Sequence, residues 1–104
     1  MACSDLGAHI DGFVAVTAHT LLVQSAAGPV TGAAADVMQA AHTAAEAAMR
    51  LIKPGKPISG VATELEKVVS AYGCSLVEGV MTHQMKQFVI DGNKVVLNKV
   101  HTPP

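Results

Sequence analysis

The sequence predicts an α+β fold. Two Asp-Gly pairs, at 11–12 and 91–92, each lie between runs rich in apolar and β-branched residues. Such pairs are a strong hairpin signal because turn residues there must accept a positive φ. Between the two pairs, apolar residues recur at helical spacing over 32–52 and 59–73. Strands, then helices, then strands again is the order typical of an α+β domain.

The first Asp-Gly pair also predicts the register in which its two flanking strands pair. If residues 11–12 form a two-residue turn, Gly7 lies opposite Val16, and Asp5 shares a face with Gly7. Asp5 is then the diagonal neighbour of Val16 across the ladder. Carboxylates at both positions could chelate one cation or bridge two, but this chain has a carboxylate only at position 5.

The remaining elements follow from local signals. Thr31 is the expected N-cap of the first helix, and Gly73 stands where a left-handed residue ends the second. We predict a strand over 13–23, helices over 32–52 and 59–73, strands over 74–80, 84–90 and 95–100, and an irregular tail over 101–104.

Composition bounds the class of protein. A chain of 104 residues fits one small domain with a modest core. Half of the residues are apolar and only 14% are charged, so we expect some apolar surface to be covered by a partner or by self-association. The net charge of −1 and the scattered Lys and Arg predict no nucleic-acid patch in this segment.

The cysteines and the absence of targeting patterns constrain the compartment in which the protein is expected. The two cysteines form no C-x-x-C pair and are expected to be reduced thiols. The N-terminus lacks the pattern of a secretory signal, and no apolar run approaches the ~20 residues needed to span a bilayer. The expectation is a soluble, intracellular protein without a cofactor and without a membrane partner.

The segment DLGAHIDGF at 5–13 resembles the first metal-binding hairpin of the methionine-aminopeptidase-like "pita-bread" fold. It is more similar to the non-peptidase branch, the proliferation-associated or ErbB-binding proteins. The resemblance continues, in consistent order, to about residue 98, through the stretches at 15–20, 35–37, 40–55 and 78–92. It implies the N-terminal half of a pita-bread fold, a curved antiparallel sheet with two helices on one face. Residues 1–104 would then form a single partial domain.

The active peptidases of this family use two Asp, one His and two Glu to hold two cations, whose shared water is activated. Carried over by position, the first Asp is Asp5, the second is Val16 and the His is His83. The two Glu would lie beyond Pro104, and a substrate-facing His before Met1. Because Val16 cannot ligate a cation, we predict vestigial ligand positions, with no bound metal and no catalytic residue.

The resemblance therefore implies a catalytically inactive binding protein. Its expected roles are growth control, ribosome biogenesis or translation through protein and RNA partners, in cytoplasm and nucleus. Two alternatives remain open. One is a metal-dependent aminopeptidase that releases an N-terminal residue, as Asp5 and His83 would suggest. The other is a truncated fragment without autonomous function.

Overall fold

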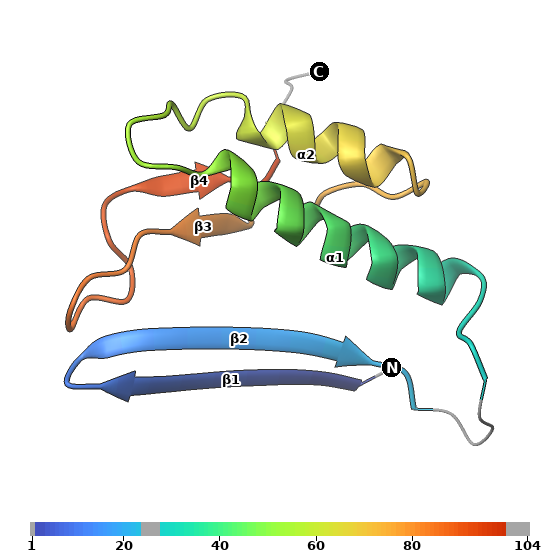
Figure 1. The fold of residues 1–104 in the computed structure, drawn as a ribbon, viewed down its shortest axis with the longest axis horizontal. Helices are drawn as coiled ribbons and strands as arrows, with labels where there is room; N and C mark the ends of the chain where they lie inside the picture. The colour runs from blue at the N-terminus through green and yellow to red at the C-terminus, as the bar shows by residue number, and fades with distance from the viewer. Residues whose placement is uncertain (1, 24–27, 100–104) are drawn as a thin grey trace. The chain divides into compact units, whose positions relative to one another are not determined.

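The computed structural model describes residues 2–23 and 28–99. The chain divides into two compact units. The hairpin unit is Met1–Val30 with His83–Val95, and the helical unit is Thr31–Thr82 with Val96–Pro104. Figure 1 labels the elements of both units, and each unit is described by itself below.

The hairpin unit is built on two long antiparallel strands, β1 (Ala2–Ile10) and β2 (Phe13–Leu21). Asp11 and Gly12 between them have φ values of 51° and 82°, as a type I′ turn requires. Gly7 pairs with Val16 and Asp5 with Ala18. The predicted register is therefore confirmed, and the strand predicted over 13–23 ends two residues early.

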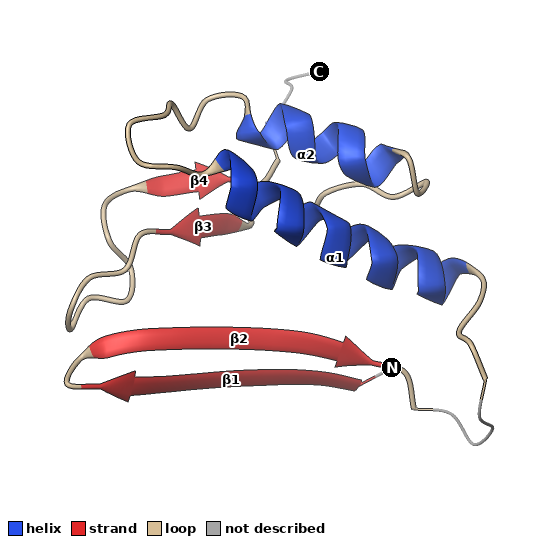
Figure 2. Cartoon of the chain, viewed as in Figure 1, coloured by secondary structure: helices blue, strands red, loops and turns tan. Residues whose placement is uncertain are grey.

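The strand predicted over 84–90 is wrong. Lys86 and Val89 exchange both backbone hydrogen bonds, at 2.9 Å each, so the chain reverses within the apolar run. Phe88 in that tight turn has a φ of 60°, a left-handed conformation that no strand residue adopts. Figure 2 accordingly draws this segment as a loop between two short strands.

These short strands are β3 (Met81–His83) and β4 (Val95–Leu97), which pair in a second two-stranded sheet. The Gln84 N–H donates to the Lys94 carbonyl at 2.8 Å. The strand predicted over 95–100 is therefore present but shorter, and position 100 lies outside the described residues. The predicted irregular tail, 101–104, also lies outside them.

The helical unit contains α1 (Ala33–Leu51) and α2 (Val61–Ser70), which pack against each other. The prediction that Thr31 caps α1 is wrong, because Gly32 occupies the N-cap with φ 80° and ψ −157° and no side chain caps the helix. That backbone conformation favours glycine. Within the described residues, neither helix combines the length and the apolar character needed to cross a membrane.

The end of α2 confirms the role predicted for Gly73, whose φ is 70°. The Gly73 N–H donates to the Ser70 carbonyl at 3.0 Å, and the Cys74 N–H to the Val69 carbonyl at 3.1 Å. These two bonds form a Schellman motif, which satisfies carbonyls that the helix leaves free.

The strand predicted over 74–80 is wrong. The described structure has no strand in this stretch, and its last residue, Val80, accepts a backbone hydrogen bond of 3.0 Å from Asn98 N–H. Gly79 has a φ of 81°, which interrupts an extended conformation. A β-branched run needs a partner strand to become part of a sheet, and local composition does not supply one.

The buried apolar side chains of the described residues all belong to the two helices. They are Ala40, Val61, Ala62, Leu65 and Val69. Beside them, the Thr43 hydroxyl and the Tyr72 hydroxyl are hydrogen-bonded at 3.2 Å, and both residues are half-buried. This bond joins α1 to the second residue after the end of α2.

Replacing Tyr72 by phenylalanine is expected to lower the free energy of unfolding by about 1 kcal/mol, because it removes this bond. The Thr43 hydroxyl then keeps the bond of 3.4 Å that it accepts from Gln39 Nε2. Thermal unfolding followed by circular dichroism measures the loss. In a Thr43→Val background the same substitution should cost much less. Equal costs in both backgrounds would contradict a hydrogen bond between the two hydroxyls.

Candidate functional site

The candidate site begins on one face of the β1–β2 hairpin. The register places Asp5, Gly7 and Val16 on this face, with Val16 directly opposite Gly7 and diagonal to Asp5. A Cβ at Gly7 would lie 3.7 Å from Cγ1 of Val16, so the valine side chain covers the position across the ladder. Where a carboxylate would complete a cation site with Asp5, the chain presents an isopropyl group.

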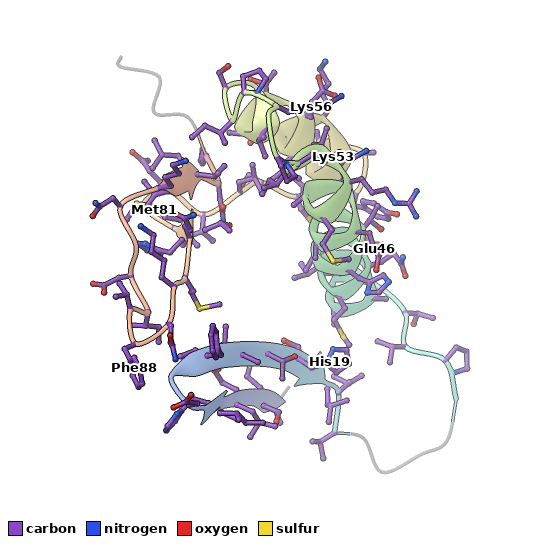
Figure 3. The ribbon with its side chains drawn as sticks, turned by 60° about the vertical axis from the view of Figure 1, so that its left-hand side comes forward. His19, Glu46, Lys53, Lys56, Met81 and Phe88 are labelled. Carbon is purple, nitrogen blue, oxygen red and sulfur yellow. The ribbon has the colours of Figure 1, made fainter. Side chains whose placement is uncertain are left out.

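The turn of the hairpin is held by the segment 84–92. The Phe88 N–H donates to the Gly12 carbonyl at 2.8 Å, and Gln87 Nε2 donates to the Asp11 carbonyl at 2.8 Å. Both turn carbonyls are thereby satisfied by residues more than seventy positions away in the sequence. Figure 3 shows Phe88 at the tip of this segment.

Gly12 is required at the contact for two reasons. Its φ of 82° disfavours a side chain, and a Cβ there would lie within 2.7 Å of Cγ, Cδ1 and Cε1 of Phe88. The ring therefore rests directly on the backbone of the turn. Its other face meets solvent, since Phe88 is 73% exposed.

An open pocket of about 410 Å³ lies between the hairpin face and this segment. Its lining is Gly7, Ala8, His9, Gly12, Val14, Val16, Phe88 and Ile90. His9 is the one polar side chain of this lining, and its Nδ1 accepts a hydrogen bond of 3.3 Å from the Gly12 N–H. The pocket is therefore largely apolar, and its lining suits an apolar group rather than a hydrated cation.

The other sequence-predicted residue, His83, is the exposed last residue of β3. Among the described residues no hydrogen bond or ion pair joins it to Asp5. Two further histidines, His19 on β2 and His42 on α1, are exposed, and Figure 3 labels His19.

These residues do not fit a two-metal centre. Such a centre needs bridging carboxylates, and Val16 offers no lone pair. Within 2–23 and 28–99, no three His, Cys, Asp or Glu side chains gather in a way that could hold a metal ion. The assignment of Asp5, Val16 and His83 as former ligand positions stays a prediction.

Sequence reasoning missed the pocket residues His9, Phe88 and Ile90. The sequence predicts Phe88 and Ile90 as parts of a strand over 84–90 and gives His9 no separate role. One signal was available, because the chain has only two Phe, and the second lies in a run that also ends in Asp-Gly. A lone aromatic residue between turn signals indicates a contact outside its own segment.

The comparisons with known proteins define the class. Residues 1–101 match metallopeptidase family M24, so the chain belongs to this family. It is similar to the structure of a thermophilic Arx1, with a TM-score of 0.78 and 26% identity over 91% of this chain and 31% of that one. This match confirms the prediction of a pita-bread fold, and the two helices and antiparallel strands are those expected of its N-terminal half.

Among curated proteins, the chain is 61% identical to ErbB-3 binding protein 1 of Solanum tuberosum over 94 residues, which are 90% of this chain and 24% of that protein. It is 31% identical to a methionine aminopeptidase of Methanothermobacter thermautotrophicus, over 90% of this chain and 30% of that enzyme. The predicted resemblance to the ErbB-binding branch is thereby confirmed. The chain spans about a quarter of the length of the first relative, and the prediction of one partial domain over 1–104 stays a prediction.

Proposed function

We propose that this chain is a catalytically inactive binding protein of the proliferation-associated, ErbB-binding type. The observation that carries the proposal is Val16, which stands diagonal to Asp5 on the hairpin face and lines an apolar pocket. A face that lacks the second carboxylate cannot bridge two cations. The higher identity to ErbB-3 binding protein 1 than to methionine aminopeptidase supports the same conclusion.

The proposed role is in growth control, ribosome biogenesis or translation, through protein and RNA partners in cytoplasm and nucleus. It rests on the family to which the chain belongs, since a fold by itself does not define a partner. The seven Lys and Arg against eight Asp and Glu favour a protein surface as the partner of this segment over bare RNA.

Two measurements test the proposal. After dialysis against Co²⁺ or Mn²⁺, mass spectrometry should find no tightly held metal, and peptides with an N-terminal methionine should not be hydrolysed. Two bound equivalents together with hydrolysis would overturn the assignment as a non-enzyme. Separately, the chain should co-sediment with purified ribosomal subunits at low salt. Absence from the subunit fraction would contradict the proposed role in ribosome biogenesis or translation.

Restoring a carboxylate by Val16→Asp is expected to leave the chain inactive. Asp at 16 would join Asp5 on one face, where His9 is the other diagonal neighbour of position 16, but two carboxylates and one imidazole are too few to hold a two-metal centre. The expected gain is at most weak binding of a single cation, measured by isothermal titration with Mn²⁺, with no peptide hydrolysis. Val16→Asn, which has the same shape without the charge, is the control. Turnover by the Val16→Asp variant would show that the ligand positions have been misassigned.

A further inference from the structure

Both backbone groups of Gly12 bind residues outside the strand ladder. Because Ile10 and Phe13 form the pair next to the two-residue turn, the N–H of Gly12 takes no part in the ladder. It donates instead to Nδ1 of His9 at 3.3 Å, while the Gly12 carbonyl accepts the N–H of Phe88 at 2.8 Å. Gly12 is buried, so both groups need these partners.

The bond from Gly12 determines which nitrogen of His9 carries the proton. A backbone N–H can only donate, so Nδ1 is the unprotonated nitrogen and the ring proton lies on Nε2. An imidazolium carries a proton on both nitrogens and has no acceptor. In that form His9 would direct one N–H at another, and the bond from Gly12 would be lost.

The loss of this bond would affect segment 84–92. The ring of Phe88 rests on Gly12, since a Cβ there would lie within 2.7 Å of three ring atoms. A buried N–H without an acceptor is unfavourable, and water can replace His9 only where the Phe88 ring leaves the turn. Loss of the acceptor therefore favours the state in which segment 84–92 is released. Because His9 and Phe88 both line the pocket, this release also changes the pocket.

We propose that His9 is a proton-sensitive latch, which holds segment 84–92 on the hairpin turn while the imidazole is neutral and releases it when Nδ1 takes up a proton. Histidine side chains change charge between about pH 8 and pH 5, so acidification within this range opens the latch. The step is a reversible protonation of Nδ1 that breaks one hydrogen bond. It concerns the conformation of the hairpin unit and is independent of the proposed binding function.

Few charged groups of the described residues face His9. On β1, Asp5 shares its face but lies about 13 Å away along the strand. The residues of β2 on this face carry no ionisable group. In segment 84–92 the charged residues are Lys86 and Asp91, and neither lines the pocket. The turn itself contributes Asp11, and within the described residues no hydrogen bond or ion pair joins it to His9.

Hydrogen exchange at Phe88 tests the proposal, because its N–H donates to the Gly12 carbonyl and is protected only while the segment rests on the turn. The protection factor corrects for the intrinsic pH dependence of exchange. In the unmodified chain it should fall at least about tenfold between about pH 8 and pH 5, as expected for one unpaired buried N–H. The amides of α2 should keep their protection. A constant protection factor at Phe88, or an equal fall throughout α2, would overturn the proposal.

His9→Asn is the matched control. The side-chain oxygen of asparagine is attached to Cγ, as Nδ1 of histidine is, and it accepts a hydrogen bond without titrating. This variant should protect the Phe88 N–H equally at both pH values. Asp11→Asn removes the nearby carboxylate but keeps a residue that suits the turn, so it should retain the full pH dependence. A fall that persists in His9→Asn, or that disappears in Asp11→Asn, would overturn the assignment to His9.

NMR of the imidazole nitrogens tests the starting point without any substitution. Long-range proton–nitrogen correlations distinguish the two neutral tautomers, and His9 should carry its proton on Nε2 at the alkaline end of the range. A proton on Nδ1 under these conditions would contradict the bond from Gly12 and would overturn the proposal.

Discussion

Replacing Gly12 by alanine is expected to release segment 84–92 from the hairpin turn and to destabilise the hairpin unit by about 2–4 kcal/mol. The left-handed backbone of Gly12 costs a non-glycine residue about 1–2 kcal/mol. The new Cβ would also lie within 2.7 Å of three ring atoms of Phe88, so the ring must move off the turn. The hydrogen bonds from Phe88 and Gln87 to the turn carbonyls depend on that position.

A matched control separates the two contributions. Gly79 has a φ of 81°, and a Cβ there would meet no atom within 4 Å. Gly79→Ala therefore reports the backbone cost alone, and the additional loss in Gly12→Ala reports the contact with Phe88. Amide hydrogen exchange should show a faster rate for Phe88 N–H in the Gly12 variant and an unchanged rate in the Gly79 variant. Equal exchange rates of the Phe88 N–H in both variants would mean that the position of the Phe88 ring does not depend on Gly12.

The elements that sequence predicted correctly are those specified by neighbouring residues. Asp11-Gly12 fixed both the turn type and the register, because φ preferences at two positions determine how two strands meet. Gly73 marked the end of the second helix for the same local reason. The register in turn placed Val16 diagonal to Asp5, so the lack of a second carboxylate next to Asp5 on this face was predictable from the sequence.

Most of the wrong predictions concern segments whose structure depends on contacts with residues distant in sequence. The stretches 74–80 and 84–90 have strand-like composition, but a strand exists only where another strand pairs with it. The contact of Phe88 with Gly12 joins residues from opposite ends of the chain, and neither segment specifies the other. The prediction of the N-cap of the first helix failed for a different reason. Thr31 has the side chain favoured at an N-cap, but the N-cap lies one residue later, at Gly32, whose backbone conformation suits glycine.

The helical unit is expected to depend strongly on Leu65. This side chain is 5% exposed and is the largest of the five buried residues, whose other members are alanines and valines. Leu→Ala substitutions in protein cores cost about 2–5 kcal/mol, through lost transfer free energy and the cavity that remains. Because the other four buried side chains are alanines and valines, they can fill little of the space, and we expect a loss of about 3 kcal/mol.

Urea unfolding followed by circular dichroism at 222 nm measures this loss, since both helices contribute to the signal. Val37→Ala is the control, because Val37 is 52% exposed on α1 and alanine has the higher helix propensity. It should change the free energy of unfolding by less than about 0.5 kcal/mol. A Leu65→Ala loss below about 1 kcal/mol, or one equal to that of Val37→Ala, would mean that the packing of α1 on α2 contributes little to the stability of this unit. The five buried side chains would then not be its core.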